Sequence, residues 1–110
     1  MKTINLELHR TKGAKVFTGR DRGIQVRRET KIDNLELTED KIKIEIPKDI
    51  MSVNPSFLEE FLYNVVIKLK KNKFYEKFEF VSESERYDIA VDLEEAVDRI
   101  LRRENALTKK

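Results

Sequence analysis

The chain has 110 residues, of which 40% are charged and 39% hydrophobic, and its 23 basic and 21 acidic residues give a formal net charge of +2. This length suits one domain with one hydrophobic core, and the balanced charge argues against a dedicated nucleic-acid-binding module, which concentrates basic residues more strongly. The chain contains no cysteine, which excludes disulfides, thiolate nucleophiles and thiolate metal sites.

The beginning of the chain predicts a β-hairpin. Residues 3–9 alternate polar and apolar side chains, as in a strand with one buried face. The apolar positions on that face are Ile4, Leu6 and Leu8. Gly13 lies in the turn that follows, and residues 15–17 predict a short second strand that closes the hairpin.

A first helix is predicted over residues 19–30. Thr18 is a suitable N-cap, because its hydroxyl can accept a hydrogen bond from the free amides of the first turn. Gly19 and Gly23 weaken a helix by up to about 1 kcal/mol each when they lie in its interior. The segment has few apolar residues, and its other faces are basic.

The middle of the chain holds the clearest strand. Residues 35–37 are predicted to be extended and residues 38–40 to form a polar turn. Residues 41–46 then alternate charged side chains with isoleucine in strict period two, which is typical of a half-buried strand. Pro47 ends this strand.

The clearest helix start follows at Asn54 and Pro55. Asparagine is a good N-cap, and proline suits the first helical position, where its missing amide costs no hydrogen bond. We expect this helix to run to about Lys71, with a broad apolar stripe that packs on a sheet. The side chains predicted to be buried together are Phe61, Leu62, Val65, Ile44, Phe78 and Phe80.

The last third begins with a predicted strand at residues 77–81 and then becomes ambiguous. Residues 87–91 alternate as in a strand, which a helix capped by Asp92 would follow. The apolar residues of this segment also fall on one helical face, and we prefer a single helix over residues 85–103. Residues 105–110 predict a flexible polar tail.

Together these elements predict one α/β domain over residues 1–104, with a small mixed sheet and helices packed on it. The N-terminus lacks the apolar region of a signal peptide. The longest mostly apolar run, residues 57–69, is too short to cross a bilayer and carries charges. We therefore expect a cytoplasmic protein that does not bind membranes.

Three segments of the chain form a pattern: residues 16–23 (VFTGRDRG), 53–62 (VNPSFLEEFL) and 74–80 (FYEKFEF). They correspond to a Gly/Arg turn into a first helix, a Ser-Phe pair that opens the next helix, and a Phe-rich strand. This pattern resembles the STAS-like domain family of unknown function, which is related in fold to sulphate-transporter and anti-sigma-factor-antagonist domains. The likeness covers roughly residues 15–103 and implies a STAS-like fold with a terminal helix.

The resemblance implies a non-enzymatic, regulatory protein–protein interaction module. Members of the family accompany histidine-kinase-like ATPase domains, so the implied partner is a protein of that kind. In the related anti-sigma-factor antagonists, a kinase phosphorylates a serine at the start of the corresponding helix. Those proteins read Asp-Ser-Ser-Gly there, whereas this chain reads Asn54-Pro55-Ser56-Phe57.

The partner-binding surface is therefore predicted in the loop of residues 49–54 and in the first turn after Pro55, with the predicted arginine helix of residues 20–28 beside it. Its candidate residues are Asp49, Ser52, Asn54 and Ser56. Ser56 is also the candidate phosphorylation site, because a phosphate near a helix N-terminus lies at the positive end of the helix dipole.

Nucleic-acid binding is the alternative function. The predicted first helix carries Arg20, Arg27 and Arg28 near one side, where they can contact phosphates, and Lys12 and Lys15 can extend the patch. However, acidic residues are interleaved, and no exposed aromatic array for base stacking is evident. We therefore prefer to interpret this helix as a solvated face.

Catalytic chemistry has little material in this sequence. His9 is the only histidine, and we expect it to be solvated on the polar face of its strand. Glu59–Glu60 and Glu94–Glu95 are adjacent pairs that point about 100° apart on a helix, so we interpret them as surface charges. We expect no enzymatic activity, no cofactor and no metal site.

Overall fold

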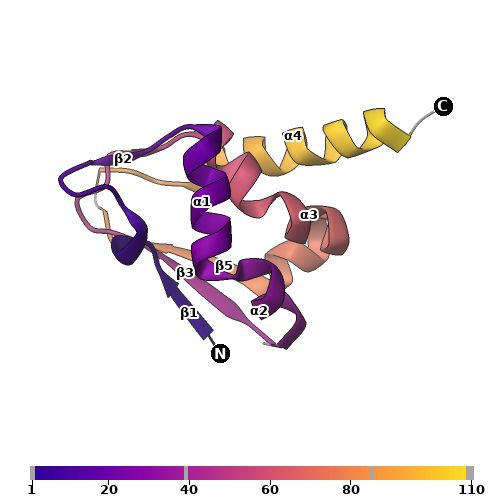
Figure 1. Ribbon diagram of the computed structural model, residues 1–110, viewed down its shortest axis with the longest axis horizontal. Coiled ribbons are helices and arrows are strands. Elements are labelled where there is room, and N and C mark those ends of the chain that lie inside the picture. The colour runs from indigo at the N-terminus through magenta and orange to yellow at the C-terminus, as the bar shows by residue number, and fades with distance from the viewer. Residues whose placement is uncertain (1, 39, 85, 109–110) are drawn as a thin grey trace.

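The computed structural model describes residues 2–38, 40–84 and 86–108, with side chains described through residue 105. Figure 1 shows a small sheet with helices packed beside it. The elements in chain order are β1 (Lys2–Asn5), the 3₁₀ helix η1 (Leu6–His9), β2 (Val16–Phe17), α1 (Arg20–Thr30), α2 (Ile32–Thr38), β3 (Ile42–Ile46), β4 (Ser52–Val53), α3 (Pro55–Lys77), β5 (Phe78–Ser82) and α4 (Ala90–Thr108). The α/β class is confirmed.

The main sheet has the strand order β1-β3-β5, and β2 and β4 form a separate pair. All of these pairings are parallel, whereas the sequence led us to expect a mixed sheet. One rung joins Ile4, Ile44 and Phe80, which face the helices. On the opposite face, Lys43 is half-buried between two exposed neighbours, so the helices cover one face of the sheet.

Helix α3 lies at the centre of the helical layer, between α1 and α4. Gly23 allows α1 to approach it closely, because a Cβ atom at this position would lie 2.4 Å from the carbonyl oxygen of Phe57. From the sequence, this glycine was interpreted only as a residue that weakens the helix. Its missing side chain is what permits the contact between the two helices.

The predicted start of α3 is confirmed. The Oδ1 atom of Asn54 accepts a hydrogen bond from the amide of Ser56 at 2.8 Å, and Pro55 is the first helical residue. The helix extends to Lys77 but is interrupted at Lys70, where φ is 66° and ψ is 176°. The predicted end near residue 71 is therefore too early, and it falls next to this interruption.

The predicted core is confirmed with one qualification. Five of its six members are fully buried, namely Phe61, Leu62, Val65, Ile44 and Phe78. Phe80 is partly buried and packs against the same cluster. The broad apolar stripe on α3 thus meets a sheet face of matching width.

The predicted N-terminal hairpin is wrong. The first strand ends at Asn5, whose side chain accepts a hydrogen bond from the amide of Glu7 and caps a 3₁₀ turn. This turn keeps Leu6 buried but leaves Leu8 77% exposed. Strand β2 exists, but it pairs in parallel with β4 and not with β1.

Two predictions near α1 and α2 also need correction. The N-cap of α1 is Gly19, with φ at 92° and no side-chain cap, so Thr18 does not cap the helix. Residues 35–37 are helical in α2 and not extended. Lys31 adopts a left-handed conformation that redirects the chain after α1, and Leu35 then packs against the core.

Neither of the two alternatives for the C-terminal segment is fully correct. Residues 87–91 form no strand, and α4 begins at Ala90, whose amide donates to Asp88 Oδ1 at 2.9 Å. The predicted helical face is buried, from Leu93 to Ile100. Helix α4 continues through residue 108, into the stretch assigned to a tail, and residues 109–110 lie outside the described part of the chain.

Candidate functional site

The loops that follow β1, β3 and β5 gather at one end of the molecule, on the left in Figure 1. They do so because the three strands are parallel, so their carboxyl ends meet at one edge of the sheet. In open α/β sheets this edge is where ligands commonly bind. A functional site is therefore expected at this edge.

A pocket of about 490 Å³ opens at this edge, and we call it the carboxyl-edge pocket. Its lining residues are Glu7, Lys15, Lys48, Asp49, Ile50, Met51, Ser84 and Arg86. They come from segments that follow all three strands of the main sheet, so the pocket depends on the whole fold.

Arg10 holds two of these segments together. Its guanidinium donates to both carboxylate oxygens of Asp49, at 2.7 and 3.0 Å, and to Glu7 Oε1 at 2.9 Å. The Arg10 side chain is only 8% exposed. The hydrogen bond from Arg10 lowers the pKa of the Asp49 carboxyl below its ordinary value. Asp49, predicted to bind a partner, thus has a positioning role within the chain.

Further hydrogen bonds fix the rest of the pocket. The amide of Met51 donates to the carbonyl oxygen of Lys15 at 2.7 Å. The hydroxyl of Ser84 donates to the carbonyl oxygen of Ile50 at 2.9 Å. These bonds join the segments after β1, β3 and β5 into one assembly, so the pocket is already formed in the free chain.

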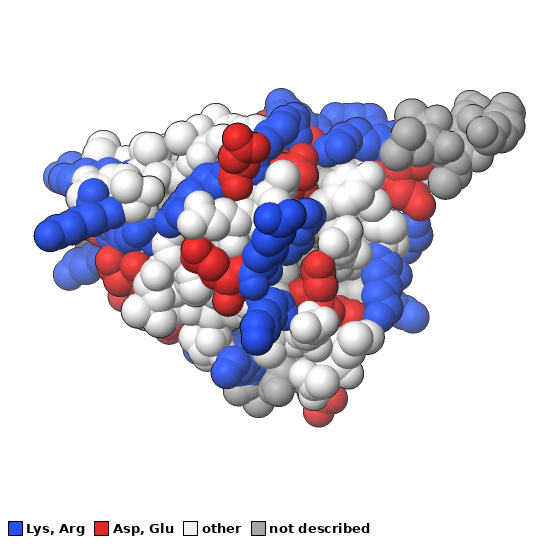
Figure 2. Space-filling model, in the orientation of Figure 1, with Lys and Arg blue, Asp and Glu red and all other residues white. Residues whose placement is uncertain are grey.

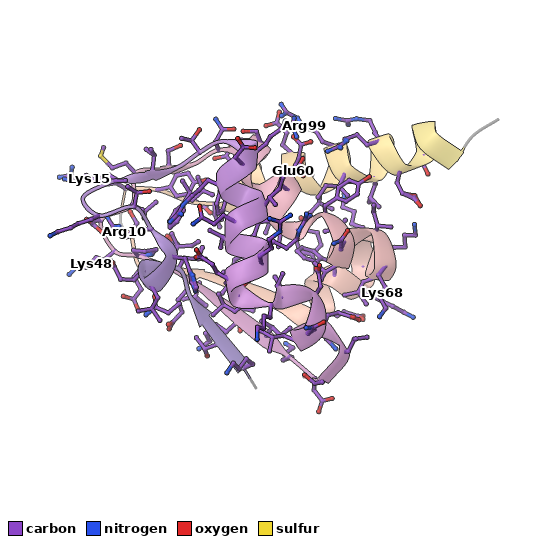
Figure 3. All side chains as sticks on the ribbon, in the orientation of Figure 1. Arg10, Lys15, Lys48, Glu60, Lys68 and Arg99 are labelled. Atoms are coloured by element: carbon purple, nitrogen blue, oxygen red, sulfur yellow. The ribbon has the colours of Figure 1, made fainter. Side chains whose placement is uncertain are left out.

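The cations of the pocket have no salt-bridge partner among the described residues, although the charge of Lys15 helps to lower the pKa of the Asp49 carboxyl. These cations are Lys15, Lys48 and Arg86. Figure 3 shows Lys15 and Lys48 pointing outward at this end of the molecule, and Figure 2 shows basic side chains projecting there. Beside them the Met51 side chain is 50% exposed.

The other predicted partner-binding residues do not line the carboxyl-edge pocket. Ser52 lies in β4 opposite Val16 and is half-buried. Asn54 caps α3, and its Oδ1 atom also accepts a hydrogen bond from the Ser56 hydroxyl at 2.8 Å. The structure therefore places Asp49 in the pocket and leaves Ser56 at the beginning of α3, beyond the short strand β4.

Tyr87 connects the segment after β5, which contributes to the pocket, with the strand β4 that precedes α3. Its hydroxyl lies 2.7 Å from Asp92 Oδ2 and 3.1 Å from the carbonyl oxygen of Val53. Burial raises the pKa of the Tyr87 phenol above its ordinary value, and the hydrogen bond to Asp92 raises it further. Tyr87 thus remains a neutral donor that ties the segment after β5 to the strand that precedes α3.

A second charged cluster lies where α1, α3 and α4 meet, and we call it the helix junction. It consists of Arg20, Glu59, Glu60, Arg99 and Arg103. Glu59 is 1% exposed, and its carboxylate lies 3.2 Å from Arg99 and 3.5 Å from Arg20. Figure 3 shows Glu60 and Arg99 in this region.

The helix junction corrects one interpretation and bears on a second. Glu59 is not a surface charge, because α1 and α4 cover both sides of α3 at this point. Two of the predicted phosphate-binding arginines also contact α3, although Arg20 stays exposed and Arg27 and Arg28 line one surface depression. Arg20 contacts both glutamates, Arg27 donates to the carbonyl oxygen of Glu60 at 2.8 Å, and only Arg28 is exposed without a salt bridge among the described residues.

His9 is also less solvated than expected. Its Nδ1 atom lies 2.9 Å from Glu29 Oε1 on α1, and its side chain is 19% exposed. This contact lowers the pKa of the Glu29 carboxyl below its ordinary value. The 3₁₀ turn that replaces the predicted strand end brings His9 toward α1, which a strand would not have done.

Most residues of the carboxyl-edge pocket were missed by sequence reasoning. Lys15 was assigned to the arginine patch, and Lys48 and Arg86 carried no motif, whereas Met51 lies in the loop of residues 49–54 that was predicted to bind a partner. The missing signal was the strand pairing, since parallel pairing alone brings these distant segments to one edge.

Within the described residues, no group of three or more His, Cys, Asp or Glu side chains is arranged to hold a metal ion. None of the helices in that part of the chain combines the length and apolar character needed to span a membrane. The fold and site define a small parallel α/β domain with a basic pocket at the carboxyl edge of its sheet. No family model matches the chain, and comparisons with curated proteins and with solved structures give no match.

Proposed function

We propose that this chain is a non-enzymatic regulatory module that binds a protein partner in the cytoplasm. Its binding surface comprises the carboxyl-edge pocket and the adjacent start of α3. The observation that carries this proposal is a preformed, open pocket that combines an exposed methionine with three cations that form no salt bridge among the described residues. The STAS-like resemblance supports the same function and suggests a histidine-kinase-like ATPase as the partner.

The composition of the pocket suits a protein surface. Methionine is flexible and is often used at surfaces that contact varied partners. Interfaces typically combine such an apolar contact with a polar rim that excludes water and selects charge. Met51 is the apolar contact here, with Lys15 and Lys48 beside it.

Ser56 supplies a means of regulating this surface. It is the second residue of α3, at the positive end of the helix dipole, and it is partly exposed. A phosphate on its hydroxyl would remove the donor to Asn54 Oδ1 and add about two negative charges beside the loop that leads from the pocket. We propose Ser56 as the modification site on this basis.

The nucleic-acid alternative has less support from the structure. It needs Arg20, Arg27 and Arg28 to face phosphates together, but Arg20 and Arg27 contact α3. Releasing Arg20 would break its ion pairs in the helix junction, and releasing Arg27 would break its hydrogen bond to the backbone of α3. We therefore favour the protein partner.

Affinity capture from the cell of origin tests this function. The tagged wild type, Ser56→Asp and Ser56→Ala are compared, with bound protein identified by mass spectrometry and bound nucleic acid quantified. We expect a stoichiometric protein that Ser56→Ala retains and Ser56→Asp loses by about tenfold, because the added charge changes the binding surface. Recovery of nucleic acid with no stoichiometric protein would instead support the alternative.

A further inference from the structure

We infer that the carboxyl-edge pocket binds an acidic segment of the partner, with one apolar side chain of that segment seated against Met51. This inference rests on the proposed protein-binding function and adds the chemistry of the partner. The charges, the apolar surface and the rigidity of the pocket support it.

The charge balance of the pocket favours an acidic ligand. Glu7 and Asp49 are its two acidic residues, and both accept hydrogen bonds from Arg10. Their charges are therefore already engaged by a nearly buried guanidinium. The remaining cations form no salt bridge among the described residues and can attract further carboxylates. Attraction between opposite charges both accelerates association and selects the partner.

The arrangement of apolar surface relative to charge favours an apolar residue within that ligand. Ile50 is fully buried beneath the pocket, whereas the neighbouring Met51 side chain is half exposed. The hydrogen bond between the Met51 amide and the Lys15 carbonyl fixes the backbone that carries the apolar contact beside the backbone that carries a cation. An acidic segment with an apolar residue within it matches this arrangement.

The lining of the pocket favours a peptide over nucleic acid as its ligand. Among the described residues no aromatic side chain lines this pocket, so bases have no surface there on which to stack. The lining instead offers two lysines, which act as flexible point charges suited to carboxylates at varied positions. A polypeptide with aspartate or glutamate side chains is therefore the ligand class that fits.

Selection from a library of random 12-residue peptides displayed on phage, with the full chain as bait, tests the inference. We expect the enriched peptides to carry several aspartates or glutamates around one large apolar residue. A fluorescent synthetic copy of one selected peptide then allows the dissociation constant to be measured by anisotropy. Raising the salt concentration from 50 to 300 mM should weaken its binding by about tenfold, because salt screens attraction between exposed charges.

Two matched triple variants locate the binding site. Lys15→Glu, Lys48→Glu and Arg86→Glu reverse the pocket cations, and Lys41→Glu, Lys73→Glu and Arg102→Glu reverse three exposed cations elsewhere. The first triple variant should weaken peptide binding by at least about thirtyfold and the second by less than about threefold, since only local charge is expected to matter. Met51→Ser should weaken it by about fivefold. The corresponding glutamine triple variant replaces the first one if charge reversal prevents folding.

Enrichment of basic or purely apolar peptides, or no enrichment at all, would overturn the inference. Equal weakening by both triple variants would do the same, as would displacement of the peptide by a short single-stranded DNA. The inference and the proposed function fail differently. A cellular protein that the pocket variant still captures leaves the function standing and removes the inference, whereas capture of no protein by the wild type removes the function.

Discussion

The helix junction and the carboxyl-edge pocket both gather arginine or lysine around two acidic residues, yet they differ in how the charges are balanced. At the helix junction, each of the three arginines lies within 3.6 Å of a glutamate carboxylate. In the pocket, Arg10 engages both acids, and three further cations form no salt bridge with the described residues.

This difference separates a structural role from a binding role. Glu59 is buried, so removing any partner of its charge affects the packing of three helices. The pocket cations lie on loops and contact solvent, so their exchange should leave the fold unchanged. The basic residues of α1 suggested a binding patch from the sequence, whereas the pattern of salt bridges in the structure points to the pocket.

The largest effect should come from the core beneath the helix junction. Phe61 is fully buried on α3, next to the glutamates, and its ring packs on Phe57 at a centroid distance of 5.8 Å. Phe61→Ala should lower the free energy of unfolding by about 3–5 kcal/mol, because it removes a large buried side chain and leaves a cavity. Urea denaturation measures this change, and a loss below about 1 kcal/mol would show that α3 packs in another way.

The approach of α1 to α3 gives the next effect. A methyl group on Gly23 would clash with the backbone of Phe57, so Gly23→Ala should destabilise the domain by about 1–3 kcal/mol despite the better helix propensity of alanine. Arg28→Ala, on the exposed side of the same helix, is the matched control. A stabilised Gly23→Ala variant in the same denaturation assay would contradict the packing described here.

Charge substitutions test the two regions against each other. Glu59→Gln should lower the free energy of unfolding by about 1.5–3 kcal/mol, the usual value of hydrogen bonds to a charged group. Lys15→Glu, Lys48→Glu and Arg86→Glu should each change it by no more than about 0.5 kcal/mol, as is typical of exposed positions. Equal losses in the two regions would show that the pocket cations are structural.

The smallest effect concerns the Arg10–Asp49 contact. Because Arg10 lowers the pKa of Asp49, this contact stabilises the loop above the ordinary pKa of 3.8 and is lost as the pH falls through the lowered value. In an NMR titration, Arg10→Gln should return the Asp49 midpoint toward 3.8, whereas Lys48→Gln should leave it low. An unchanged midpoint in Arg10→Gln would refute the pairing.

Local signals in the sequence predicted much of this fold. The period-two pattern of β3 and the cap at Asn54 were sufficient, because alternation and capping are properties of neighbouring residues. Long-range geometry was not accessible in this way. Nothing local to Val16 reveals that it pairs with Ser52, or that Gly23 is needed for contact with Phe57.

The candidate site followed the same division. Local turn and capping chemistry made the loop that contains Asp49 and the helix start that contains Ser56 candidates from the sequence, and their role in binding stays a prediction. The sequence could not indicate Arg86. This residue lies far along the chain from Asp49 and enters the pocket only through the parallel pairing of β5 with β3. Burial of Glu59 likewise depends on two helices distant in sequence.

Site-specific photocrosslinking in the cell of origin tests most directly whether the carboxyl edge is the binding surface. A photoreactive phenylalanine analogue would replace Met51 in one variant and Leu37, an exposed apolar residue on α2, in another. We predict one discrete protein crosslink from position 51 and none from position 37. A crosslink to the same protein from position 37 alone, or crosslinks to nucleic acid only, would contradict the account.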